Sequence, residues 1–188
     1  MSRRAHGYLV AGLLCTAAAT MLVVQFAFPP AKNDLDLQLP RSVAKLEAAV
    51  GSTPEARERN RRHTYADFAF LASYTAVFAA AGTLLARQGP RWSRVLGLLA
   101  VATGVATGVL DVLENLTILR ELRPGADLPE LYSRVRGFSI PKWILAAITD
   151  FALASFLAFR RRSKVLGFLG LLAAAGAIGS LLTLKRVF

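Results

Sequence analysis

Residues 104–119 read GVATGVLDVLENLTIL, and this stretch decides what kind of protein the chain is. It lies in an apolar run long enough to cross a bilayer, yet it contains Asp111, Glu114 and Asn115. Acidic groups inside a membrane are rare, costly and usually functional. At about 100° per residue, Gly104, Gly108, Asp111 and Asn115 share one narrow helix face. We therefore expect a close-packed, polar helix face that points into a multi-pass membrane protein.

The composition agrees with this interpretation. Of 188 residues, 54% are hydrophobic and 19% are charged, against about 25% charged in an average soluble domain. The net charge of +11 comes from short basic clusters between apolar runs, which is typical of topology signals and lipid-headgroup contacts rather than of a nucleic-acid-binding domain. The sequence predicts an all-α, polytopic membrane bundle that forms one transmembrane domain over residues 1–188.

Five apolar runs are long enough to span a bilayer. They cover about residues 7–28, 65–86, 94–119, 140–159 and 165–184. The first run follows a basic start, as in a signal peptide, but it ends without a small-x-small cleavage site, so we expect it to be retained. The fifth is rich in small residues and suits close packing in a homo- or hetero-oligomer. Those residues are Gly167, Gly170, Ala174, Gly176 and Gly179.

The connections between spans also carry signals. We expect residues 29–64 to be extracytoplasmic and to include an amphipathic helix at 40–50 that lies on the membrane surface. Residues 53–55 read Thr-Pro-Glu, a helix start signal that predicts one unbroken helix over about 54–86. Residues 124–137 contain two prolines and two glycines, so we expect a polar connection there.

The basic residues predict the orientation. Arg3 and Arg4 would lie on the same side as the short, arginine-rich loops at 87–94 and 160–164. Short loops rich in lysine and arginine stay in the cytoplasm. We therefore expect a bacterial inner-membrane protein with a cytoplasmic N-terminus and an extracytoplasmic C-terminus.

This topology brings polar residues of three spans together in the outer half of the membrane, as in the sites of helical bundles. Glu114 and Asp111 are the candidate catalytic residues, acting as acid and base or as polar anchors. The candidate ligand-binding residues are Asp67, Tyr74, Asn115, Lys142, Trp143 and Asp150. The alternative is purely structural, since Asp111 or Glu114 could pair with Lys142 only to satisfy buried charge.

Three short motifs in successive spans resemble an uncharacterised family of small bacterial membrane proteins. They are Asp67-Phe68-x-Phe70-x-x-x-Tyr74, Asp111-x-x-Glu114-Asn115 and Lys142-Trp143. The resemblance covers about residues 41–159 and includes an arginine-rich segment before the second span, here at 55–62. It implies a shared site without an established activity.

Three functions remain open. The first is binding or processing of a lipid or another apolar small molecule. The second is an accessory or assembly subunit whose buried charges are structural. The third is a proton- or cation-linked transporter, which the absence of an internal repeat disfavours. We expect membrane lipids as partners, no nucleic acid, no cofactor and no metal, because Lys142 and several arginines accompany the acids. The sequence leaves open whether the protein is an enzyme.

Overall fold

The computed structural model describes residues 3–31, 34–88, 90–123, 125–159, 161 and 163–185. Its elements are α1 (Arg3–Ala27), α2 (Asp34–Gln38), α3 (Val43–Val50), α4 (Pro54–Ala86), α5 (Arg91–Glu121), α6 (Leu128–Ala154), the 3₁₀ helix η1 (Ser155–Phe159) and α7 (Lys164–Leu184). Five segments are long and apolar enough to cross a membrane, namely α1, α4, α5, α6 with η1, and α7. The predicted all-α bundle with five spans is confirmed.

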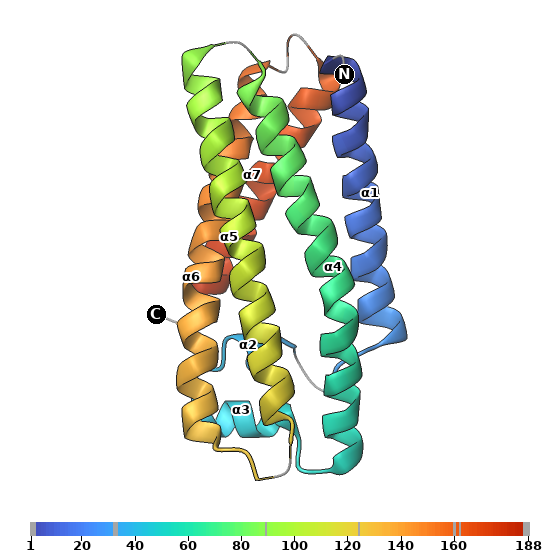
Figure 1. The fold of residues 1–188 in the computed structure, drawn as a ribbon, viewed down its shortest axis with the longest axis vertical. Helices are drawn as coiled ribbons and strands as arrows, with labels where there is room; N and C mark the ends of the chain where they lie inside the picture. Colours follow the sequence, from blue (N-terminus) through green and yellow to red (C-terminus); the bar gives the residue numbers. More distant parts are fainter. Residues whose placement is uncertain are drawn as a thin grey trace.

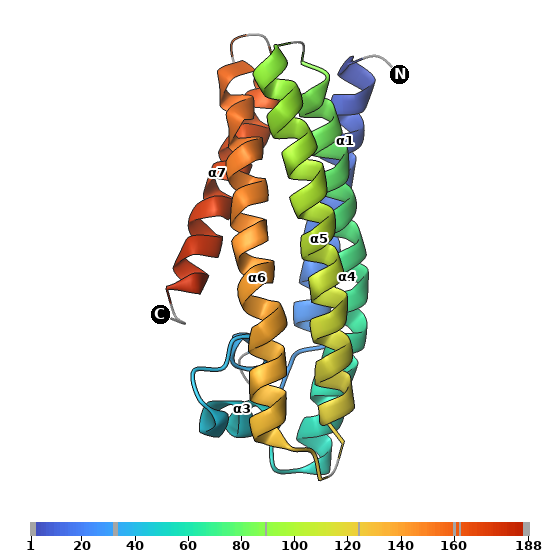
Figure 2. The same cartoon turned by 60° about the vertical axis from the view of Figure 1, so that its left-hand side comes forward.

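The long helices run alternately up and down (Figure 1). One end of the bundle, here called the upper end, holds the start of α1 and the α4–α5 and η1–α7 connections. The lower end holds α2, α3 and the α5–α6 connection, and α7 stops short of it (Figure 2). Consecutive long helices pack side by side: α1 on α4, α4 on α5, α5 on α6 and α6 on α7.

The upper half of the bundle is tightly packed and apolar. Its buried core, called the upper core below, takes side chains from all five long helices: Val10, Ala81, Leu84, Leu85, Ala100, Ala152, Leu153, Phe156, Phe159, Leu166, Leu169 and Ala173. Gly82 and Gly97 let the backbones of α4 and α5 approach closely, since a Cβ atom on Gly97 would lie 2.5 Å from the Gly82 carbonyl oxygen. Burial of apolar side chains at high density stabilises this half.

The small residues of α7 pack inside the chain. A Cβ atom on Gly170 would lie 2.6 Å from the backbone nitrogen of Leu157, and one on Gly176 would lie 2.6 Å from an Asp150 carboxylate oxygen. The outward side of α7 carries large apolar side chains such as Phe168. An oligomer formed through the small residues of this helix stays a prediction, and at these two glycines the space is already used within the chain.

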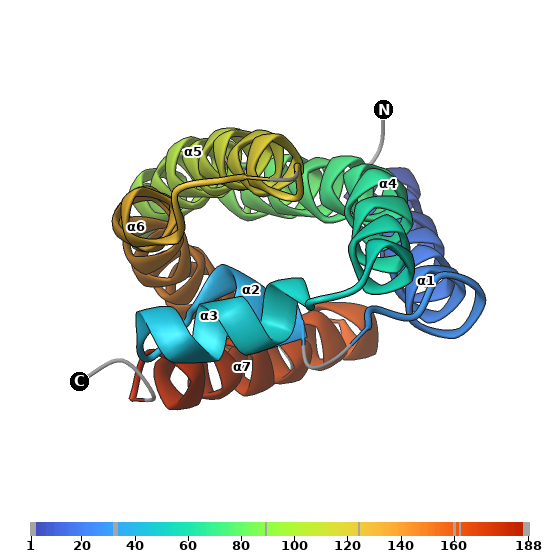
Figure 3. The ribbon, with the colours of Figure 1, turned by 90° about the horizontal axis from the view of Figure 1, so that it is seen from below.

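The short helix α3 lies crosswise at the lower end (Figures 1 and 3). Its apolar residues Leu46, Ala49 and Val50 are buried. They form a second apolar cluster with Leu37 of α2, Ile118 of α5 and the following Leu122, and Leu131 and Val135 of α6. We expected this amphipathic helix to turn its apolar side to the membrane surface. That expectation was wrong in this respect, because the apolar side is covered by the bundle itself.

The start of α6 also corrects the sequence analysis. We expected a polar connection over residues 124–137, but the helix begins at Leu128. The Asp127 carboxylate accepts a hydrogen bond from the Glu130 N–H at 3.1 Å and so caps the helix. Glu130 then pairs with Arg134 one turn later. Pro129 lies in the first turn of this helix, where its missing N–H does no harm.

Helix α4 is continuous from Pro54 to Ala86, as predicted. Its charged first third contains two buried residues that hold the neighbouring connections. Asn60 donates to the last carbonyl groups of α3 at 2.9 and 3.1 Å and accepts from the Ala31 N–H at 2.8 Å. His63 Nδ1 lies 2.7 Å from the carbonyl oxygen of the residue that follows α1. These contacts hold the segment between α1 and α4 at the lower end of the bundle.

Candidate functional site

One face of α5 packs along α4 and changes character on the way down. From the upper to the lower end, the facing pairs are Gly97 with Gly82, Gly104 with Phe78, Gly108 with Thr75, Asp111 with Tyr74, and Asn115 with Asp67. The predicted close-packed polar face is therefore confirmed. Contact between the two helices passes from backbone against backbone to polar side chain against polar side chain.

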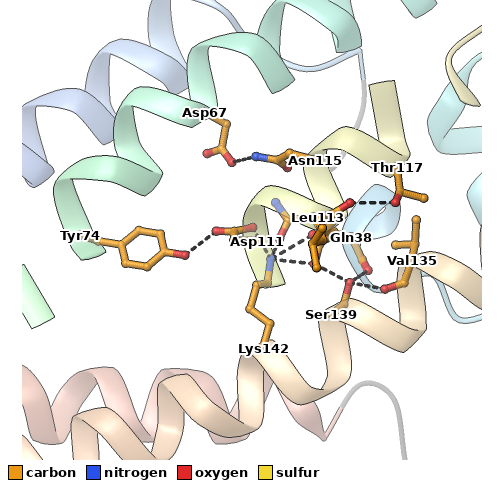
Figure 4. Close-up of polar contacts among 11 residues, drawn as sticks. Gln38, Asp67, Tyr74, Asp111, Leu113, Asn115, Thr117, Val135, Ser139 and Lys142 are labelled. Atoms are coloured by element: carbon orange, nitrogen blue, oxygen red, sulfur yellow. Dashed lines mark hydrogen bonds and ion pairs between the residues drawn. The ribbon is translucent and has the colours of Figure 1, made fainter. Parts of the chain in front are cut away.

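The centre of the polar region is the ammonium group of Lys142 (Figure 4). It donates to Asp111 Oδ1 at 2.8 Å and to the Glu114 carboxylate at 2.9 Å. The Gln38 side chain of α2 accepts a third hydrogen bond from it at 3.1 Å. Lys142 is only 5% exposed and Glu114 is fully buried. One lysine thus faces two carboxylates, and all three of its N–H donors have acceptors within the protein.

Further side chains complete this network. Tyr74 donates its hydroxyl hydrogen to Asp111 Oδ2 at 2.6 Å, and Asn115 donates to Asp67 Oδ2 at 2.9 Å. The Ser139 hydroxyl lies 2.7 Å from Glu114 Oε2. It is also within reach of the Gln38 and Val135 carbonyl oxygens, so its single hydrogen is shared among these acceptors. The residues of this network come from four elements, α2, α4, α5 and α6.

A cavity of about 720 Å³ lies beside this network. Phe70, Tyr74 and Phe78 of α4 form one wall, and Asp111 and Lys142 belong to another. Ligand pockets in proteins usually measure about 300–1,000 Å³ and combine apolar walls with a few convergent polar groups. The cavity has both the size and the lining of a small-molecule site.

The cavity reaches the side of the bundle between α1 and α7. Met21 and Gln25 of α1 and Gly179 of α7 line it, and all three are exposed. Higher up, α1 and α7 both contribute to the upper core, and the two helices diverge toward the lower end (Figures 2 and 3). The surface around the opening carries exposed apolar side chains, including Leu22 and Leu182. The opening therefore faces the apolar belt of the molecule.

Comparison with known proteins adds no assignment to this geometry. No protein-family model, curated protein or solved structure matches the chain. The resemblance to small bacterial membrane proteins through the three motifs stays a prediction. The function is accordingly argued from the charges, contacts and openings of the site.

The predicted site residues divide into two groups. The cavity is lined by Asp67, Tyr74, Asp111, Lys142, Trp143 and Asp150. Glu114 and Asn115 are buried behind this lining, at 0% and 2% exposure. A catalytic role for Glu114 stays a prediction, and its contacts with Lys142 and Ser139 are those of an ion-pair partner. Asn115 orients Asp67.

Two members of the network were missed by sequence reasoning. Gln38 lies in α2, within a segment that we interpreted only as polar and extracytoplasmic. Ser139 precedes Lys142 by one helical turn, but we placed the start of that span at residue 140. The continuation of the helix before Lys142 was the signal that could have revealed Ser139. Nothing local in the sequence marks Gln38.

The chemistry available to the site is that of charged and aromatic side chains. The described part of the chain contains no group of three or more His, Cys, Asp or Glu residues placed to hold a metal ion. The Lys142 ammonium lies 5.6 Å from the centroid of the Trp143 ring, within the range of a cation–π contact. The indole N–H of Trp143 is buried and has no hydrogen-bond acceptor.

Proposed function

We propose that the protein binds a lipid or another amphiphilic small molecule in this cavity, and that the molecule enters sideways from the bilayer. The side opening between α1 and α7 is the observation that carries the proposal. A site that opened only to water would select soluble ligands. An opening within the apolar belt selects molecules that are already dissolved in the membrane.

The lining supports an amphiphile over a purely apolar ligand. The inner wall, on α5 and α6, carries Asp111, Lys142 and Asp150, whereas α1 contributes the apolar side chains of Met21 and Val24. A ligand with a polar group directed inward and an apolar body directed outward matches both ends. A purely apolar molecule would remove water from the polar wall without replacing its hydrogen bonds, which is unfavourable.

Binding is better supported than catalysis. Lys142 and Asp111 hold each other in an ion pair, and Tyr74 occupies the second Asp111 oxygen. Glu114 is covered by Lys142 and Ser139 and does not line the cavity. A general acid or base must lie within hydrogen-bond reach of the reacting group, and neither carboxylate offers an unoccupied oxygen to a ligand. We infer that this network shapes and orients the site.

We further propose that the upper end is cytoplasmic and that the cavity lies in the outer half of the membrane. Arg87, Arg91, Arg94 and Lys164 lie at the upper end, in or beside the short connections. Short basic loops favour the cytoplasm. A reporter fused after Phe188 is expected to report an extracytoplasmic end, and a cytoplasmic signal would contradict this orientation.

Filling the cavity tests the proposed function. Ala146 lines the cavity, so Ala146→Phe should occupy part of the ligand volume. Ile148→Phe is the matched control, because Ile148 is 38% exposed and does not line the cavity. We expect oleyl alcohol, an uncharged amphiphile, to bind the purified parent chain and the control in mild detergent, measured by native mass spectrometry. Ala146→Phe should weaken binding by about tenfold or more, since 1.4 kcal/mol of lost contact is tenfold in affinity.

The same experiment separates the alternatives. Thermal unfolding of Ala146→Phe shows whether the variant is folded. If a folded Ala146→Phe variant binds the probe as the parent does, or if the parent does not bind it, the proposed site is wrong. Purely structural charges in an accessory subunit would then be the better explanation. The complete set of partners around Lys142 is the observation that favours that second candidate.

A further inference from the structure

One cavity residue has no part in the network around Lys142. Asp150 lies eight positions further along α6, which at 1.5 Å per residue places it about 12 Å higher. It lines the same cavity. Its carboxylate is half-buried. Among the described residues, no basic group and no hydrogen-bond donor contacts it.

The fold makes room for this carboxylate. A Cβ atom on Gly176 of α7 would lie 2.6 Å from Asp150 Oδ2 and 2.9 Å from its carboxyl carbon. Any other residue at position 176 would therefore push the carboxylate away from its place. Close approach of a glycine is what allows α7 to pass Asp150 while the carboxylate keeps its place at the cavity wall.

Asp150 has no share in the basic group of this cavity. Lys142 is the one basic residue among the described lining residues. Lys142 is already shared between Asp111 and Glu114. A carboxylate inside a membrane is costly without a partner. The partner that Asp150 lacks in the chain can be supplied by a ligand.

Aromatic side chains of the same cavity add to this preference. The rings of Phe70 and Tyr74 are 5.4 Å apart, and those of Tyr74 and Phe78 are 5.6 Å apart. All three line the cavity. Aromatic faces attract cations, including quaternary ammonium groups, and also pack well against apolar ligand bodies.

We propose that the ligand is a cationic amphiphile, with one ammonium-type charge that binds at Asp150 and an apolar body that extends toward the opening between α1 and α7. This inference rests on the proposed function, because it concerns the ligand of the same cavity. The ligand supplies the positive charge, and Asp150 supplies the negative charge.

Two probes with the same apolar body test the charge. Oleyl alcohol is uncharged, and oleyltrimethylammonium carries a fixed positive charge. Binding of both to the full chain is measured by native mass spectrometry for the parent, Asp150→Asn and Asp127→Asn. Asp127 is the matched control, because it caps the other end of α6 and does not line the cavity. Asparagine preserves its capping role. The two probes partition differently into detergent, but this difference is the same for every variant and cancels when the variants are compared.

The parent and Asp127→Asn should bind the cationic probe with the same preference over the uncharged one. Asp150→Asn should lower that preference by about tenfold or more, the equivalent of one lost hydrogen bond to a charged group. Gly176→Ala, which displaces the carboxylate and leaves its charge, should lower it as well. Equal preference in the parent and Asp150→Asn, with both probes still excluded by Ala146→Phe, would overturn the charge assignment and leave the proposed site intact. If Ala146→Phe does not affect the uncharged probe, the proposed function itself fails.

Discussion

The two halves of the bundle solve the same packing problem in opposite ways. In the upper half, the helices meet through apolar side chains and through the close approach of Gly82 and Gly97. In the lower half, α4, α5 and α6 stand around a cavity and are joined by polar contacts such as Tyr74 to Asp111 and Lys142 to Asp111. The upper half is a packed apolar core, and the lower half contains the cavity.

The comparison shows how one helix face serves both purposes. On α5, Gly97 brings the α4 backbone near, whereas Asp111 and Asn115 further down reach α4 through side-chain hydrogen bonds. Glycine at an interface between membrane helices improves packing. Carboxylate and amide side chains instead reach across a wider gap and form directional hydrogen bonds. They therefore join helices that stand further apart, which leaves room for a cavity beside them.

The largest effect is expected from Lys142→Met. This change leaves Asp111 and Glu114 buried and facing each other without their shared cation. Removal of one partner from a buried ion pair costs about 3–5 kcal/mol. We expect a large drop in the thermal unfolding temperature of the purified protein in detergent.

A double variant shows whether this loss comes from the charges. Glu114→Gln combined with Lys142→Met removes one positive and one negative group and leaves Asp111 with the Tyr74 hydroxyl as donor. The double variant should be more stable than Lys142→Met and more stable than Glu114→Gln. If both single variants unfold at the temperature of the parent, the lower half is not held by its ion pairs and the contrast between the halves is lost.

The features that could be predicted are those that depend on local sequence patterns, such as apolar length, residue spacing and helix caps. The five spans follow from apolar length, and the polar face of α5 follows from the spacing of Gly108, Asp111 and Asn115. The helix start before Pro54 follows from its threonine cap. Each of these depends on a single segment and its own solvent, the bilayer or water.

The features that could not be predicted depend on tertiary contacts. The apolar side of α3 is typical of a helix on a membrane surface, but α5 and α6 cover it. Gln38 joins the site only because the segment before α3 folds back under α6. The cavity depends on the separation of α1 and α7 in the lower half. No sequence pattern in either helix predicts that separation.

The smallest effects sharpen the comparison most directly, through the same substitution in each half. Gly97→Ala places a methyl group against the Ala86 backbone nitrogen, closer than van der Waals contact allows, so α4 and α5 must move apart. Overpacking of this kind costs about 1–3 kcal/mol. Gly179→Ala is the matched change in the lower half, where a Cβ atom would meet nothing within 4 Å. Thermal unfolding should show a clear loss for Gly97→Ala and none for Gly179→Ala, because alanine also favours the helix. Equal losses would mean that the lower half is as tightly packed as the upper half, and a cavity open between α1 and α7 would then be untenable.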